Sequence, residues 1–427
     1  MPLRFVVAVV AALASLPAHA QSAFGVEAAA RDRDPGAGSR TITGEPRTSA
    51  RRPRISLGED GFEIAPADRR YTLELGGRVH VDWTRHSGDT GPATPVDGAE
   101  LRRARIAVGA ELGEPWRAFG EVDFGGGDVA VKDLWIAYDV SDAIRVTLGQ
   151  QKQPYNLGLE MSSNDIPFVE RGVDNALVEP FVDRAVGVRV DASGRRWFFA
   201  GGVFGEPIDD EHEGWGTSAR FVAAPVVEAG VALHLGLRVA YREPAADRGA
   251  RLRDETTSSS DVAIVDTAPI AGADAVTLYG PEAAIAVGPF SVFGEYSRAR
   301  VEHTAGTLSF DGWHIAAAWS VTGESRAAVY DLAAGEFKRL EPHTALSPGN
   351  GAGAWELAAR YASIDLNDDF LVGGTENTIT LAANWYPNRR VRMMLDWTRI
   401  VDTDASNDVR AAAEGLDVVT FRVQCAF

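Results

Sequence analysis

Residues 71–83, YTLELGGRVHVDW, decide the fold class because hydrophobic and polar side chains alternate along them. Apolar or aromatic residues occupy most odd positions, and polar or charged residues occupy most even positions. Successive side chains of a β-strand point to opposite faces, so this stretch predicts a strand with one apolar and one polar face. The same period of two recurs in residues 231–242, 313–322 and 378–385.

Segments of this kind continue to the C-terminus, and they number about sixteen. Most have about ten residues or more, the length that an oblique membrane crossing needs, whereas sandwich strands have about five or six. The expected strands are 71–86, 100–112, 115–125, 130–139, 143–153, 184–192, 195–205, 214–224, 230–242, 274–287, 289–303, 309–322, 353–365, 375–387, 389–402 and 414–427.

The connections between these segments predict how the strands are arranged. Short turns alternate with longer loops, as at 113–115, 193–194, 288–289 and 387–388 against 87–99, 154–183, 243–273 and 403–413. An even number of strands with short turns at one end and long loops at the other is the plan of an outer-membrane barrel. The sequence therefore predicts an all-β fold, a transmembrane antiparallel β-barrel. A secreted β-sandwich or propeller is the alternative.

Both ends of the chain support export to the outer membrane. Residues 1–20 combine a basic start, an apolar stretch and an Ala-His-Ala cleavage site, which predicts a signal peptide too short to span a bilayer. Residues 21–60 are rich in arginine and small residues, and we expect a flexible periplasmic tail there. The barrel is expected over residues 61–427. Its last strand ends at Phe427 in the manner of an outer-membrane assembly signal.

The composition excludes several classes of function. The 427 residues include 42 Lys and Arg against 60 Asp and Glu, a formal net charge of −18, which argues against a nucleic-acid-binding protein. The single cysteine, Cys425, excludes an intrachain disulfide and a multi-cysteine metal cluster. The eight histidines form no catalytic constellation, and no G-x-S-x-G motif is present. We therefore expect no enzyme, no metal and no cofactor.

Several motifs, in order and spacing, resemble the phosphate-selective porins O and P. They are 75–78 (LGGR), 101–106 (LRRARI), 132–138 (KDLWIAY), 148–155 (LGQQKQPY), 162–165, 169–171, 200–204, 234–236, 322–325, 353–361 and 384–386. The resemblance implies a sixteen-stranded, trimeric barrel whose lumen is narrowed by inward-folded loops and lined by arginine and lysine. It also implies that 154–183 is the constriction loop and that 323–352, long where a short turn is expected, is a structured excursion on the periplasmic side.

The candidate anion-binding and pore-lining residues are all basic. Strand parity points Arg78, Arg103 and Arg105 into the lumen. Arg102 shares the lipid-facing parity of Ile106, so we expect either a β-bulge or a place above the membrane. Within the resemblance, Arg171 matches an arginine of the family's constriction loop, and Lys132 and Lys152 are further candidates near the same level. The full set is Arg78, Arg102, Arg103, Arg105, Lys132, Lys152 and Arg171.

These residues predict an outer-membrane porin for passive diffusion of small anions, such as phosphate, polyphosphate or organic acids. The resemblance implies that its other partners are outer-membrane lipid and two further copies of the chain. Each arginine has a competing role, which is to pair with a nearby carboxylate of the wall. Phosphate-specific members of the family carry an acid where Lys132 stands, and the 154–183 loop has six acids against Arg171. A general diffusion porin, non-selective or weakly cation-preferring, is therefore an alternative. A closed structural barrel is another, and bulky apolar inward residues would mark it.

Overall fold

The computed structural model describes most of the chain after the N-terminal region. The described residues are 54–57, 61–65, 71–88, 96–210, 214–245, 249–255, 263–349, 351–368, 371–404 and 414–427. The predicted signal peptide and residues 21–53 and 58–60 of the predicted tail lie outside them. Among the described residues, no helix has the length and apolar character needed to cross a membrane.

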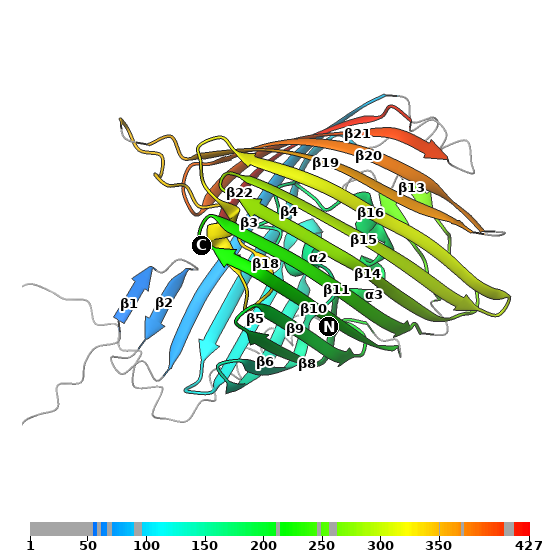
Figure 1. Cartoon of the computed structure of the whole chain (residues 1–427), viewed down its shortest axis with the longest axis horizontal. Helices are drawn as coiled ribbons and strands as arrows, with labels where there is room; N and C mark the ends of the chain where they lie inside the picture. Colours follow the sequence, from blue (N-terminus) through cyan, green and yellow to red (C-terminus); the bar gives the residue numbers. More distant parts are fainter. Residues whose placement is uncertain are drawn as a thin grey trace, which may run out of the picture.

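The alternating segments form one antiparallel β-barrel (Figure 1). Its sixteen strands pair with their neighbours in chain order, and β22 closes the barrel by pairing with β3. They are β3 (Thr72–Ser87), β4 (Gly98–Glu111), β5 (Trp116–Asp123), β6 (Ala130–Ser141), β7 (Ile144–Lys152), β8 (Arg184–Gly194), β9 (Trp197–Phe204), β10 (Trp215–Glu228), β11 (Val231–Glu243), β14 (Ala273–Val287), β15 (Phe290–His303), β16 (Gly306–Ser320), β19 (Ala354–Asp368), β20 (Leu371–Tyr386), β21 (Val391–Asp404) and β22 (Asp417–Ala426). The predicted fold class is confirmed.

The period of two places apolar side chains outside and polar ones inside. On β3, Val79, Val81 and Trp83 are 38%, 44% and 47% exposed on the outer face, whereas His80 and Asp82 are buried on the inner face. An apolar outer band with a polar interior is what a lipid-surrounded barrel requires.

A hairpin of two short strands precedes the barrel. Strands β1 (Arg54–Leu57) and β2 (Phe62–Ala65) pair with each other, and β2 pairs with the start of β3, where Phe62 lies opposite Leu75. Figure 1 shows the hairpin at the same end of the barrel as the C-terminus. The predicted tail to residue 60 therefore needs correction at β1. Arginine-rich composition concealed the four-residue alternation of β1, which pairs with β2, and β2 in turn pairs with the part of β3 that β22 leaves unpaired beyond Ala426.

Two segments fold into the lumen from opposite ends. The first, residues 153–183, contains α2 (Leu157–Glu160), the 3₁₀ helix η3 (Val173–Leu177) and α3 (Glu179–Val182). It is anchored to the inner wall, since the Leu157 amide donates to Glu282 at 2.9 Å and the Val169 amide donates to Asp396 at 2.8 Å. We call it the lumen segment.

The second segment enters from the end that carries the C-terminus. It contains η4 (Arg326–Val329), β17 (Tyr330–Asp331) and β18 (Glu336–Phe337). Arg220 of β10 donates to the carbonyl of Gly335 at 2.8 Å. A loop with β12 (Arg253–Glu255) and β13 (Ala263–Asp266) joins β11 to β14 at the other end.

These insertions cover the inner wall of the barrel unevenly. Inward side chains of β10 to β22 are mostly buried beneath them, and Arg220, Arg392 and Arg422 have no exposed surface. In contrast, several inward residues of β5 and β6 stay half-buried, including Phe119 and Trp135. The least covered part of the inner wall therefore includes β5 and β6.

Candidate lumen site

A β-bulge brings two consecutive arginines of β4 to the same side. His80 of β3 pairs with Arg103, but the next residue, Val81, pairs with Leu101, so Arg102 is the extra residue of the bulge. A bulge re-aims the side chains beside it. This explains how Arg102, whose parity would point it to lipid, reaches the lumen segment together with Arg103.

Both arginines bind the carboxylate of Glu170 in the lumen segment. Arg103 donates from Nη1 to Oε1 at 3.0 Å and from Nη2 to Oε2 at 3.2 Å, and Arg102 donates from Nε to Oε1 at 3.1 Å. Arg422 of β22 adds a third guanidinium at 2.7 Å. Burial alone would raise the pKa of Glu170, but these three cations outweigh it and hold the pKa well below its usual range.

Arg422 is a member of this cluster that sequence reasoning missed. Its guanidinium also binds both oxygens of Asp82, each at 2.6 Å, so it links β22, β3 and the lumen segment. The signal was present in the sequence, because Arg422 has the inward parity of the last strand. Its partner became identifiable only once barrel closure paired Arg422 with Asp82. A cavity of about 330 Å³ adjoins this cluster, and Arg102 and Glu170 line it.

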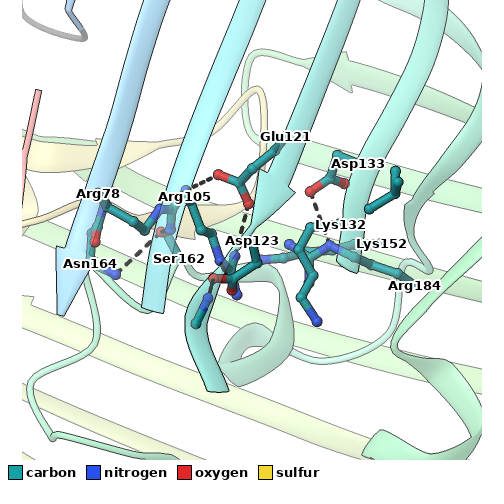
Figure 2. A network of polar contacts seen from close by, with 12 residues as sticks. Arg78, Arg105, Glu121, Asp123, Lys132, Asp133, Lys152, Ser162, Asn164 and Arg184 are labelled. Atoms are coloured by element: carbon teal, nitrogen blue, oxygen red, sulfur yellow. Dashed lines mark hydrogen bonds and ion pairs between the residues drawn. The ribbon is translucent and has the colours of Figure 1, made fainter. Parts of the chain in front are cut away.

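A second cluster joins Arg78 and Arg105 on the same wall (Figure 2). Arg78 donates to Glu121 at 2.7 Å and to Ser162 of the lumen segment at 2.8 Å. Arg105 donates to Glu121 at 2.8 Å and to Asp123 at 2.6 Å. The structure thus places all four predicted wall arginines inside the lumen, and each is paired with a carboxylate.

The other three predicted residues have no carboxylate partner among the described residues. Lys132 is the extra residue of a second bulge, because Glu121 pairs with Asp133 whereas Val122 pairs with Val131. Figure 2 shows its side chain with no interaction drawn to any neighbour. Lys152 donates only to carbonyl oxygens, those of Glu160 at 2.7 Å and Met161 at 3.3 Å. Arg171 likewise donates to the carbonyls of Gly158 at 2.6 Å and Met161 at 3.1 Å.

Two further arginines of β8 belong to this wall and were not predicted. Arg184 donates to Asp133 at 3.0 Å, and Arg189 binds Glu160 of the lumen segment at 3.1 Å and 3.2 Å. The inward parity of Arg189 within residues 187–191 was a usable signal. Among the described residues, no group of three or more His, Cys, Asp or Glu side chains is placed to hold a metal ion.

Comparison with known proteins identifies relatives over most of the chain. The model of the family "Phosphate-selective porin O and P" matches residues 73–427. Porin O of Pseudomonas aeruginosa is 26% identical over 410 residues, which cover 86% of this chain and 91% of Porin O. An uncharacterized protein of Caulobacter vibrioides is 29% identical over 363 residues, which cover 81% of this chain and 69% of that protein.

Solved structures share the fold at low sequence identity. OprB of Pseudomonas putida has a TM-score of 0.55 at 12% identity, with 84% of this chain and 95% of that chain covered. An anion-selective porin from Comamonas acidovorans has a TM-score of 0.52 at 12% identity, with 84% and 100% covered. At this identity the likeness concerns the barrel alone.

Proposed function

Because the chain belongs to the phosphate-selective porin O and P family, we propose that its lumen passes small anions in preference to cations. The protein is an outer-membrane porin, a channel rather than an enzyme. In this proposal, the lumen segment is the constriction, and Lys132, Lys152 and Arg171 supply the attracting charge.

The observation that carries the proposal is the lack of a carboxylate partner for these three cations among the described residues. An ion pair such as Arg103 with Glu170 presents little net charge to a passing ion, whereas an unneutralised ammonium keeps its full field. Screening at physiological salt has a length of about 8 Å, so only charges close to the passage select the ion. The overall net charge of −18 therefore has little influence on selectivity.

Phosphate is one anion in this proposal, together with small carboxylates. Guanidinium forks suit phosphate oxygens, and the family description and the relative named Porin O favour it. However, the forks of Arg78, Arg102, Arg103 and Arg105 already hold Glu170, Glu121 or Asp123. We therefore expect phosphate to permeate without a tight site.

We further propose that three copies associate in the outer membrane, surrounded by lipid. The solved structures similar to this chain include a trimer form of OmpT of Vibrio cholerae, with a TM-score of 0.52 at 12% identity. The apolar outer face supports contact with lipid or with a second copy. Light scattering of the detergent-solubilised protein measures the number of copies, and a monomer would contradict this part.

Reversal potential in a planar bilayer tests the selectivity. Under a KCl gradient, the reversal potential of the mature protein should lie closer to the equilibrium potential of chloride than to that of potassium. Lys132→Gln should move this reversal potential toward zero. Arg399→Gln is the matched control, because it removes one cation from an exposed rim site that pairs with Asp417. A cation preference in the unmodified protein, or no change in Lys132→Gln, would contradict the proposal.

A general diffusion porin is the second candidate, and the many ion pairs on the wall favour it. Loop acids Glu160 and Glu170 face wall arginines in these pairs. If these ion pairs neutralise the charge of the passage, the reversal potential should lie near zero in both the unmodified protein and Lys132→Gln.

A further inference from the structure

Two aromatic rings stand among the charges on the inner face of β5 and β6. Phe119 of β5 and Trp135 of β6 are direct cross-strand partners, and their rings stack with centroids 5.5 Å apart at an angle of 26°. They share the inward parity of Glu121 and Asp133, which bind lumen arginines. Both rings are half-buried. Neither anion selection nor the ion pairs of the wall make use of them.

The pair is not packing for the inserted segments. The buried apolar clusters that fix the lumen segment to the opposite wall use residues such as Phe168, Phe181 and Phe293, and neither Phe119 nor Trp135 belongs to them. Among the described residues, the indole N–H of Trp135 has no hydrogen-bond partner, and this N–H is not buried. The rings and this donor therefore face space that a solute can enter.

The residues next to the two rings in the same row of the sheet are glycines. In the same row across the sheet, Gly109 pairs with Phe119, Gly149 pairs with Trp135, and Gly187 pairs with Gly149. A side chain at Gly109 would begin 3.5 Å from the Glu74 carboxylate and 3.9 Å from the Phe119 ring, so Glu74 borders the rings beyond Gly109. Two rings bordered by glycines make a flat apolar patch within a polar wall, and we call it the aromatic patch.

A free cation stands close to the aromatic patch. Lys132 lies three residues from Trp135 along β6, which corresponds to about 10 Å of strand. Its ammonium has no partner among the described residues. A solute with a carboxylate at one end and an apolar body at the other can contact both. Inorganic phosphate and acetate have no such body.

We propose that the aromatic patch is a binding subsite for organic acids with an aromatic body, whose carboxylate is attracted by Lys132. This inference rests on the proposed anion-preferring lumen and adds the chemical class of the preferred solute. Stacking on aromatic rings contributes roughly two- to tenfold in affinity. The rings thus discriminate among anions after charge has selected them.

Block of chloride current by added solutes tests the subsite. In a planar bilayer with KCl, benzoate should reduce the current at a concentration several-fold lower than acetate or inorganic phosphate. Glucose, which offers an apolar face without charge, should have little effect. Phe119→Leu and Trp135→Leu keep apolar bulk but remove the rings, and each should abolish the advantage of benzoate over acetate.

The outer face of the same two strands supplies the control. Trp116 and Tyr138 form an edge-to-face pair with centroids 4.8 Å apart, and they are 45% and 39% exposed outside the barrel. Trp116→Leu and Tyr138→Leu should leave the benzoate advantage intact. Equal block by benzoate and acetate, an advantage that survives both inward substitutions, or block by glucose as strong as by benzoate would overturn the subsite.

The same recordings separate this inference from the proposed function. The reversal potential reports anion preference independently of block, so a cation-preferring channel refutes the proposed function and the subsite together. An anion-preferring channel without a benzoate advantage refutes only the subsite. Heat-modifiable mobility on gels confirms that each variant forms a folded barrel before it is recorded.

Discussion

Glu170 and Arg103 form a two-point ion pair, with Oε1 to Nη1 at 3.0 Å and Oε2 to Nη2 at 3.2 Å. The pair joins the lumen segment to β4 at a bulge, and Arg102 and Arg422 bind the same carboxylate. Glu170 therefore occupies the position among three guanidinium groups that a permeating anion would otherwise take. The ion pair both anchors the lumen segment to β4 and reduces the positive potential of the wall.

Removing the charge of Glu170 should increase anion preference. In Glu170→Gln, three guanidinium groups lose their shared carboxylate beside the 330 Å³ cavity. We expect the chloride-to-potassium permeability ratio to rise roughly two- to fivefold, from Coulomb energies with screening. Reversal potential in a KCl gradient measures it. An unchanged ratio would mean that the passage does not sense this cluster.

The cluster around Glu170 should resist acid. The pKa of Glu170 in the fold lies well below its usual range. A carboxylate with a depressed pKa contributes stability at pH values above its ordinary pKa, and that contribution is lost only as pH falls through the depressed value. The anchoring of the lumen segment should therefore persist below pH 4, and single-channel conductance between pH 7 and pH 4 should show no step from its release.

Asp165 should take up a proton at a higher pH than Glu170 does. Burial raises the pKa of Asp165 above its usual range, although Lys338, Arg339, Arg78 and Arg326 partly oppose the shift. As pH falls through this raised value, Asp165 becomes neutral and the lumen gains one unit of positive charge. Anion preference should rise with acidification, and Asp165→Asn should already show the higher preference at pH 7. A pH response as large in Asp165→Asn as in the unmodified protein would contradict this assignment.

Sequence periodicity predicted the barrel well and the ion pairs poorly, for a physical reason. Alternation at Val79, His80 and Val81 is local, and it determines which face of a strand meets lipid. The partner of Arg422 is not local, since Asp82 lies at the other end of the chain and meets it only when the barrel closes. The bulge at Arg102 was foreseeable because its parity conflicted with that of Ile106. The pairing of Arg102 with Glu170 depends on the path of the lumen segment, which periodicity does not specify.

Arg422 should be the most costly of the lumen arginines to remove. Its side chain is fully buried between Asp82 and Glu170. Breaking a buried pair from one side leaves uncompensated charge, which costs about 3–5 kcal/mol. We expect Arg422→Gln to lower the free energy of unfolding by that amount in urea titrations of the protein in lipid vesicles. Arg399→Gln, at an exposed rim pair, should change it by less than about 1 kcal/mol.

The position of Lys132 should depend on Gln150. The bulge at Lys132 interrupts the pairing of β5 with β6, and the Gln150 side chain donates from Nε2 to the carbonyls of Val131 at 2.5 Å and Lys132 at 3.3 Å. Gln150→Leu removes the donor to these two carbonyls and the acceptor of the Ile208 amide at 2.5 Å, and a polar group left unpaired in a buried place costs about 1–3 kcal/mol. The bulge should then relax, and Lys132 should lose its fixed place on the wall.

Combining Gln150→Leu with Lys132→Gln tests whether Gln150 influences selectivity through Lys132. Gln150→Leu alone should shift the reversal potential toward zero, as Lys132→Gln does, and the double variant should shift it no further than Lys132→Gln alone. Additive shifts would show that Gln150 influences selectivity by a route other than Lys132, because independent sites add and a shared mechanism does not.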